Sequence, residues 1–368
     1  MFEGRKPLGG WIVWPTLLVL AFAVGCGGGD ESDEFDTSIS TTGTAPTTAD
    51  LDSTAAPGAT ASPAPVAAAL VPTPTVASPP PIVASTATTV AVSPNRPSTW
   101  VYWLSDIDLE AISSARPPVV VIDHSRDGSP EGAFTKVEIQ QLRSALPEPA
   151  LVIAYMSIGE AEDYRYYWQD DWKSGNPEWL DSVNPDWAGN FKVRYWDPDW
   201  QRVVFGGEGA YLDRILAAGF DGVYLDIIDA YEYFAERGRD SAEAEIVEFV
   251  TAIGTYARKL NPGFLVIPQN APELGTLADY LGAVEGIGVE GIYFGYDEQD
   301  VPTEASVTRE LEDVLGTWVS AGKLVLTVDY ATSPDNVSEA YERAASQGFT
   351  PTVTDVELEG LPSPPPGR

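Results

Sequence analysis

From Trp100 onward, short runs of β-branched and aromatic residues alternate with longer segments in which apolar residues recur every three or four positions. This alternation is typical of parallel strands connected by crossover helices. Eight of the runs predict strands. They cover residues 100–105, 119–124, 151–158, 222–228, 264–269, 288–294, 324–330 and 350–354.

The helical half of the pattern is clearest after the fourth predicted strand, where apolar residues at helical spacing predict one buried helix face. These residues are Ile246, Phe249, Val250, Ile253, Tyr256, Ala257 and Leu260. Asp240 or Ser241 can cap the start of this helix, and the Asn-Pro-Gly run at 261–263 ends it. The same spacing recurs over 307–318, and a Ser-Pro pair at 333–334 predicts the start of the last helix.

Eight strands separated by helices predict a (β/α)8 TIM barrel, an α/β fold in which the sheet closes on itself. The pattern covers residues 99–360, which is about the length of one such barrel, so we expect a single domain. An open, doubly wound sheet is the alternative. A nucleotide-binding version of that sheet is disfavoured because no Gly-rich phosphate loop follows the first strand.

The two ends of the chain have a different composition. Basic residues, an apolar run and small residues before Cys26 predict a signal peptide over 1–26. Its end resembles the lipobox of bacterial lipoproteins, so we expect Cys26 to be lipidated and to anchor the protein at the extracellular face of the cell envelope. Secretion without a lipid is the alternative. Residues 27–98 are mostly Ala, Thr, Ser and Pro and predict a disordered tether, and the Pro-rich tail at 361–368 also predicts disorder.

Charge narrows the possible partners. The chain has 55 acidic and 21 basic residues, a formal net charge of −34. This balance disfavours nucleic acid, because phosphate backbones bind clusters of Lys and Arg. A cationic ligand would complement the charge, although charge that only keeps the protein soluble is the commoner case. We expect a monomer that meets the membrane only through its lipid anchor.

The residue types also limit metal chemistry. Cys26 is the single cysteine and lies outside the predicted barrel, and His124 is the single histidine. A zinc site or a Ser-His-Asp triad would have to be built around His124, which we interpret as structural. We therefore expect no cofactor and no bound metal. A hydrolase that holds Mg²⁺ or Ca²⁺ through acidic side chains alone is an alternative.

A long insertion at 160–208 separates the third and fourth predicted strands, and six of the eleven tryptophans lie in it. Long insertions in compact domains usually serve function. Aromatic rings are suited to stacking on sugar rings, whereas a local aromatic core is the structural alternative, and we expect about half of the six to be structural. The six are Trp168, Trp172, Trp179, Trp187, Trp196 and Trp200.

Acidic residues recur where the predicted strands end, and in a barrel such side chains converge on one open face. Burying many acids together costs free energy through repulsion and raised pKa values, which a ligand or a reaction has to offset. Glycoside hydrolysis uses one protonated carboxyl, one ionised carboxylate and further groups that hold sugar hydroxyls. The acids are Asp106, Asp123, Glu160, Asp226, Asp229, Glu290 and Asp329.

Neutral groups near the same strand ends would complete a sugar-binding rim. Tyrosines in the first, third and seventh strands supply hydroxyls, at Tyr102, Tyr155 and Tyr330. Two amides, Gln269 and Asn270, follow the fifth strand. The residues that we expect to bind substrate are Asp123, Tyr155, Glu160, Asp229, Gln269, Asn270, Asp329 and Trp103.

Several ordered motifs are spread over residues 100–355. They are VVID at 120–123, AYMSIGEAE at 154–162, WDPDW at 196–200, GFDGVYLD at 219–226, PQN at 268–270 and VEGIY at 289–293. With these motifs the chain resembles glycoside hydrolase family 114, whose members include endo-α-1,4-polygalactosaminidases. The resemblance implies a (β/α)8 fold and hydrolysis of α-1,4-linked galactosamine polymers. His124 and Gly291 differ from the commoner family residues.

The resemblance also implies the catalytic residues. The family's catalytic Asp falls on Asp226, at the end of the fourth strand, and its catalytic Glu falls on Glu290, in the sixth. By analogy with retaining barrel α-glycosidases, Asp226 is the nucleophile and Glu290 the acid/base, with the reverse assignment open. A non-catalytic cell-surface barrel that only binds polysaccharide is the competing function.

Overall fold

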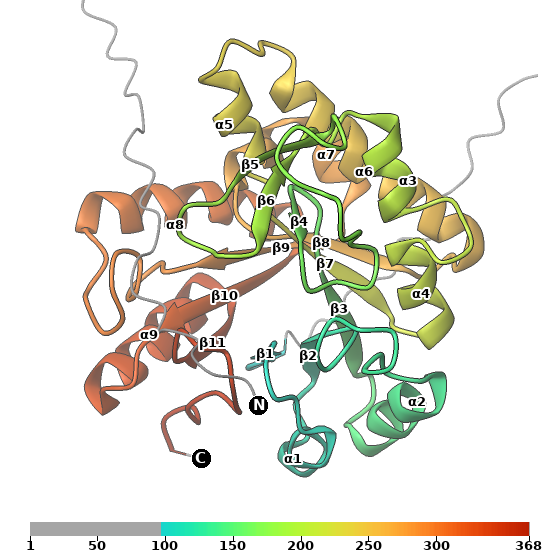
Figure 1. Ribbon diagram of the computed structural model, residues 1–368. Coiled ribbons are helices and arrows are strands. Elements are labelled where there is room, and N and C mark those ends of the chain that lie inside the picture. The colour runs from blue at the N-terminus through green and yellow to red at the C-terminus, as the bar shows by residue number, and fades with distance from the viewer. Residues whose placement is uncertain (1–96, 368) are drawn as a thin grey trace, which may run out of the picture. The chain divides into compact units, whose positions relative to one another are not determined.

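In the part of the chain that the structure describes, eight parallel strands form the core and helices surround them (Figure 1). The computed structural model describes residues 97–367, so the predicted signal peptide, Cys26 and the predicted tether up to residue 96 lie outside the described residues. All eight predicted strands are present, although the sixth ends at Glu290 and not at residue 294. The strands are β1 (Val101–Trp103), β2 (Val119–Asp123), β3 (Leu151–Ser157), β7 (Gly222–Asp226), β8 (Leu265–Pro268), β9 (Gly286–Glu290), β10 (Leu324–Tyr330) and β11 (Thr350–Thr354).

These strands form the predicted (β/α)8 barrel and not an open sheet. Strands β1, β2, β3, β7 and β8 pair in that order, and β9, β10 and β11 pair in a second group. A parallel bridge between Gln269 and Gly288 joins the two groups. At the other seam, between β1 and β11, the backbone N–H of Leu104 donates a hydrogen bond to the carbonyl of Leu358 (2.9 Å).

Alternation of side chains along each strand divides the apolar core in two. In β10, Leu324, Leu326, Val328 and Tyr330 belong to a cluster that fills the barrel, whereas Val325 belongs to the larger cluster between the strands and the helices. A rim residue can therefore reach a ligand at the barrel mouth only if it is in phase with the inward-facing set.

The helices follow the predicted spacing. Most of the apolar face predicted for α6 is buried, but Leu260 is 60% exposed because it lies in the last turn. Ser241 is the N-cap residue of α6, yet its side chain accepts no hydrogen bond from the helix. The helices are α1 (Leu109–Ala115), α2 (Lys136–Ala145), α3 (Pro198–Val204), α4 (Tyr211–Ala218), α5 (Ala230–Ala235), α6 (Ala242–Leu260), the 3-10 helix η1 (Pro272–Thr276), α7 (Ala278–Ala283), α8 (Ala305–Ser320) and α9 (Pro334–Gln347).

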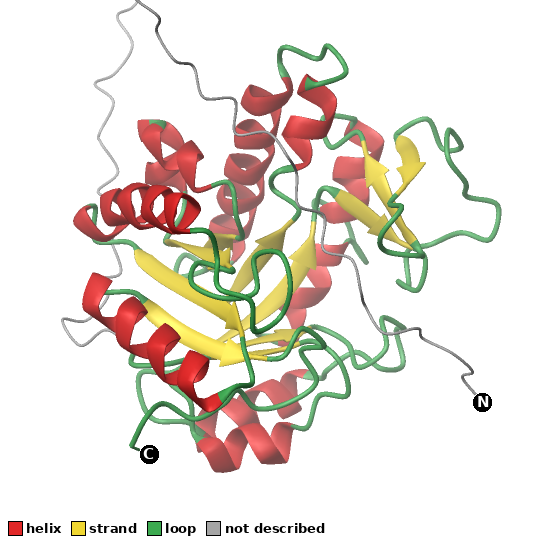
Figure 2. Cartoon of the chain, turned by 90° about the vertical axis from the view of Figure 1, so that its left-hand side faces the viewer, coloured by secondary structure: helices red, strands yellow, loops and turns green. Residues whose placement is uncertain are grey.

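The insertion after β3 forms a small antiparallel sheet of β4 (Glu160–Glu162), β6 (Asn190–Val193) and β5 (Leu180–Val183), in that order. Figure 2 shows this sheet to one side of the barrel strands. Because β4 follows directly from β3, the insertion extends from the C-terminal end of the barrel. It can therefore contribute residues to the face where barrel enzymes hold their substrates.

The tail after β11 is better fixed than we predicted. Residues 361–367 contain no helix or strand. However, the Ser363 N–H donates to the carbonyl of Val353 (2.8 Å), and the Tyr341 hydroxyl donates to the carbonyl of Ser363 (2.8 Å). These two bonds hold the start of the tail against β11 and α9. Within residues 97–367, no helix has the length and apolar character needed to cross a membrane.

Candidate active site

Two acidic residues lie at the C-terminal ends of two nearby barrel strands and face the mouth of the barrel. Asp226 is the last residue of β7 and Glu290 the last residue of β9, with β8 between them. Asp226 is in phase with Tyr224, which belongs to the cluster inside the barrel. Both acids keep part of their surface exposed. The structure therefore places them where a bound ligand could touch both.

Each of the two carboxylates is held by a tyrosine from the adjacent strand. The Tyr155 hydroxyl, on β3, donates to Oδ2 of Asp226 (2.6 Å), and the backbone N–H of Ile227 donates to Oδ1 (2.8 Å). The Tyr330 hydroxyl, on β10, donates to Oε1 of Glu290, and the Asn270 side-chain amide donates to Oε2 (3.1 Å). Both carboxylates are therefore fixed in orientation, as a catalytic pair requires.

The charge of Glu290 also affects the ionisation of Asp226. Burial, followed by the charge of Glu290, raises the pKa of Asp226 to about 8. Because the charge of Glu290 disfavours ionisation of Asp226, at neutral pH the pair is expected to hold one proton. One protonated and one ionised carboxyl is the state that glycoside hydrolysis uses.

A layer of tyrosines lies beneath the pair. The Tyr102 hydroxyl donates to Oε1 of Gln269 (3.0 Å), and Tyr224 packs at 5.3 Å from the Tyr102 ring. A side chain at position 288 would clash with this layer, because a Cβ there would lie 1.9 Å from the Tyr224 hydroxyl oxygen. Glycine at 288 thus makes room for the floor of the site. Gln269, which we predicted to bind substrate, belongs to this floor and is buried.

Asp229 and Glu160 extend the acidic site toward the insertion. Burial raises the pKa of Asp229 to about 6, although Lys192 opposes the shift, and Asp229 stays partly exposed. Glu160 is buried and accepts from Asn184 (2.9 Å) and Lys192 (3.3 Å). Asp229 is therefore placed to touch a ligand beside the pair, whereas Glu160 positions Lys192 and the insertion.

Asp123 lies in phase with the barrel interior, but its oxygens are already occupied. Oδ2 lies 2.7 Å from Nη1 of Arg165, and Oδ1 accepts from the Ser125 N–H (2.9 Å) and contacts Nδ1 of His124 (3.2 Å). Although burial raises its pKa, Arg165 and His124 hold the pKa of Asp123 below its usual value. The structure therefore makes Asp123 part of a buried ion-pair network and not a sugar ligand. The His124 ring packs 4.8 Å from Tyr211.

The structure contradicts two further predicted substrate contacts, Asp329 and Trp103. Asp329 is out of phase with Val328 and Tyr330, so it faces the helix layer, where Oδ1 accepts from the N–H groups of Tyr293 and Phe294. Trp103 belongs to the outer cluster and is 6% exposed. Both errors have one cause: position at a strand end does not say which face of the sheet a side chain occupies.

The insertion tryptophans mainly form a local core. Trp168, Trp172, Trp179 and Trp200 pack against one another in sequence, two pairs edge to face and one tilted, with ring centroids 5.4, 4.8 and 5.0 Å apart. Trp196 packs against Phe234 at 4.7 Å. The prediction that half would be structural was too low, because these five all contact the core. Trp187 is partly exposed.

The sequence analysis did not identify two buried cationic side chains near the site. Arg165 joins Asp123 to Glu162, and Lys192 lies between Glu160 and the ring of Tyr233 (4.9 Å). Neither belongs to a motif that indicates a site, and the approach of their partners depends on how the insertion folds back. Among residues 97–367, no group of three or more His, Cys, Asp or Glu side chains is placed to hold a metal ion.

A closed barrel with Asp226 and Glu290 at its C-terminal mouth, each oriented by hydrogen bonds, has the architecture expected of a barrel glycoside hydrolase. A family model described as glycoside-hydrolase family GH114 matches residues 82–364. The chain belongs to this family and is a glycosidase by class.

Similar proteins agree with this family. An uncharacterized protein from Deinococcus radiodurans is 42% identical over 254 residues, which cover 69% of this chain and 78% of that protein. One from Methanocaldococcus jannaschii is 37% identical over 284 residues, covering 73% and 79%.

Two solved structures have the same fold. The glycoside hydrolase domain of PelA from Pseudomonas aeruginosa has a TM-score of 0.56 at 18% identity, covering 73% of this chain and 98% of that domain. Aspergillus fumigatus Ega3, solved in complex with galactosamine, has a TM-score of 0.55 at 19% identity, covering 75% and 98%. At these identities the likeness shows the fold.

Proposed function

We propose that the protein hydrolyses α-1,4-linked galactosamine-type polysaccharide at Asp226 and Glu290. The observation that carries the proposal is the pair itself: two oriented acids at the barrel mouth, with the pKa of Asp226 raised by burial and by Glu290. The substrate class is supported by the galactosamine bound to Ega3 and by the net charge of −34, which complements a cationic polymer.

In the proposed reaction, Glu290 donates a proton to the glycosidic oxygen while the Asp226 carboxylate attacks the anomeric carbon. The glycosidic bond breaks and a glycosyl ester forms on Asp226; water, deprotonated by Glu290, then hydrolyses that ester. In the ligand-free protein, burial and the charge of Glu290 raise the pKa of Asp226 to about 8, which favours its protonated form at neutral pH. The assignment therefore requires the proton to pass to Glu290 when the sugar binds.

The roles are tested by azide rescue of the two alanine variants. For a retaining α-glycosidase, azide rescue of Asp226→Ala yields a β-glycosyl azide, because azide replaces the nucleophile. Rescue of Glu290→Ala yields an α-glycosyl azide, because azide attacks the glycosyl ester. The opposite pattern would exchange the two roles and leave the site unchanged.

The raised pKa of Asp226 predicts the basic limb of the pH profile. Activity needs one proton on the pair, so kcat/KM should fall as pH rises through about 8, where that proton leaves. The hydrogen bond from Tyr155 lowers the pKa of Asp226, so Tyr155→Phe should move this limb to higher pH and reduce kcat about tenfold. Tyr166→Phe, which removes a bond to the Gly209 carbonyl, is the matched control and should leave the profile unchanged. A limb that stays in place in Tyr155→Phe contradicts the prediction.

A surface barrel that only binds polysaccharide is the second candidate. The partly exposed acids of the mouth would suit a cationic polymer even without turnover. Retention of the polymer with no new reducing ends after prolonged incubation would favour it. Loss of turnover on chelation would instead favour a hydrolase that depends on a metal.

We also propose that lipidation of Cys26 holds the enzyme at the extracellular face of the cell envelope. The basis is the sequence of residues 1–26. Cys26→Ser should move the protein from the membrane fraction to the medium and abolish labelling by a radioactive fatty acid. Equal labelling of both proteins would contradict lipidation at this position.

A further inference from the structure

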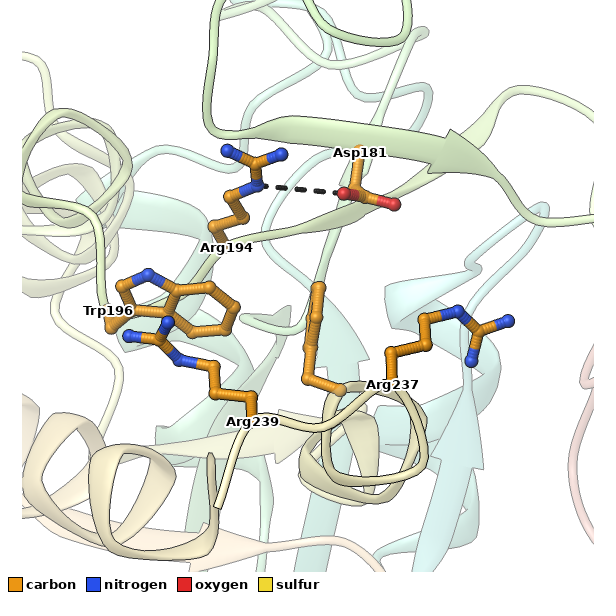
Figure 3. Close-up of a pocket in the computed structure, with 6 residues that line it drawn as sticks. Asp181, Arg194, Trp196, Arg237 and Arg239 are labelled. Carbon is orange, nitrogen blue, oxygen red and sulfur yellow. Dashed lines mark ion pairs between the residues drawn. The ribbon is translucent and has the colours of Figure 1, made fainter. Parts of the chain in front are cut away.

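A pocket of about 310 Å³ lies where the insertion meets α5 (Figure 3). Its walls carry three guanidinium groups, two aromatic rings and one carboxylate. They come from Asp181, Arg194, Trp196, Phe234, Arg237 and Arg239. None of these residues belongs to the proposed catalytic pair. Three of the six are arginines, although the chain as a whole has a net charge of −34.

The pocket is connected to the active site through α5. Asp229 directly precedes this helix. Phe234, inside the helix, is five residues after Asp229, which corresponds to roughly 7 Å along a helix axis. The Tyr233 hydroxyl donates to Oδ1 of Asp181 (3.0 Å), and the Tyr233 ring lies 4.9 Å from Lys192, whose charge acts on Asp229. The pocket therefore lies near Asp229, on the side of the insertion.

The lining suits a sugar that offers hydrogen-bond acceptors. Figure 3 shows Arg239 lying against Trp196, with its guanidinium carbon 3.6 Å from the ring centroid, and Arg194 on the opposite wall beside Asp181. Guanidinium groups only donate hydrogen bonds. The one carboxylate, Asp181, already accepts from Tyr233 and lies 3.6 Å from Nε of Arg194. A sugar ammonium group would therefore face donors and cations.

The same residues do not favour a fully charged anion. Arg239 is paired with Glu245 through two bonds of 2.6 and 2.7 Å, and Arg194 lies 3.5 Å from Glu178. Arg237 lies 3.9 Å from Glu236. Carboxylates thus balance the arginines, so the pocket offers donors without a surplus of positive charge. An acetamido carbonyl is a neutral acceptor that matches this lining.

From these contacts we infer that the pocket is an outer subsite for an N-acetylated amino-sugar residue of the polymer, while the acidic mouth takes a deacetylated residue. The inference rests on the proposed function. It assigns the protein a preference for partly acetylated chains over fully deacetylated ones, set by Arg194, Arg237 and Trp196.

The test uses the full chain with Asp226→Asn and Glu290→Gln, so that binding is measured without turnover. Titration calorimetry compares α-1,4-linked galactosamine hexamers that are partly N-acetylated with fully deacetylated hexamers. We expect the first to bind about tenfold more tightly, and we expect Arg194→Met with Arg237→Met to abolish that difference. Both arginines are partly exposed, and methionine keeps the apolar stem, so folding should be retained.

Arg202→Met is the control, because Arg202 lies exposed on α3 and should leave the preference intact. In the active enzyme, Arg194→Met with Arg237→Met should raise KM for long, partly acetylated chains. Equal affinity for the two hexamers, or a preference that survives in the pocket variant, would overturn the inference. An intact enzyme that releases no reducing ends from either polymer would overturn the proposed function, whereas the binding preference would still test the pocket.

Discussion

Asp226→Asn and Glu290→Gln are each expected to reduce the release of reducing ends from α-1,4-linked galactosamine polymer by at least about 10³-fold. The amides keep the shape of the acids but cannot attack the anomeric carbon or transfer the proton. Because the two acids act as a unit, the double variant should lose little more activity than either single variant.

Asp106→Asn and Glu298→Gln are matched controls, since both acids are exposed and neither takes part in the pair. They should retain full activity. Undiminished turnover in both Asp226→Asn and Glu290→Gln would exclude this site, and a large loss in the controls would point to an effect of overall charge instead.

The substitution Asp226→Asn should also reveal that the buried acid lowers the stability of the folded protein. The pKa of Asp226 is raised to about 8 in the folded protein, against about 3.9 in an unfolded chain. Its contribution to stability is therefore fully present below pH 4 and is lost as pH rises toward 8. Asn cannot ionise, so Asp226→Asn should unfold at higher temperature than the wild type at pH 8 and show no such gain near pH 4.

Arg165→Met is expected to lower the free energy of unfolding by about 3–5 kcal/mol, because it leaves two buried carboxylates without their cation. The Arg165 side chain is fully buried and lies 2.7 Å from both Asp123 and Glu162. Urea unfolding at pH 7 measures the loss. Arg202→Met is the control, because the Arg202 side chain is 73% exposed and an exposed ion pair contributes about 0–1 kcal/mol.

The loss in Arg165→Met should shrink in acid. Despite burial, Arg165 keeps the pKa of Asp123 below its usual value, so this part of the stability is present at neutral pH and is lost as pH falls through the lowered pKa. Adding Asp123→Asn and Glu162→Gln to Arg165→Met should recover much of the stability. A triple variant as unstable as Arg165→Met would show that packing, and not unpaired charge, causes the loss.

The order of apolar runs along the chain was sufficient to predict the barrel, because strand and helix periodicities are local properties of sequence. It also placed Asp226 at the end of the fourth strand and Glu290 within the sixth, which in the structure ends at Glu290. Tyr155 and Asn270, predicted as neutral groups of the rim, indeed contact this pair.

Which face of the sheet each side chain occupies, and which charges meet, was decided by the tertiary structure alone. Asp329 and Trp103 lie one position out of phase with the barrel interior, so they face the helices. Asp123 points inward but is neutralised by Arg165, which lies 42 residues along the chain. Burial and pairing depend on contacts between distant segments, and no local pattern of residues encodes them.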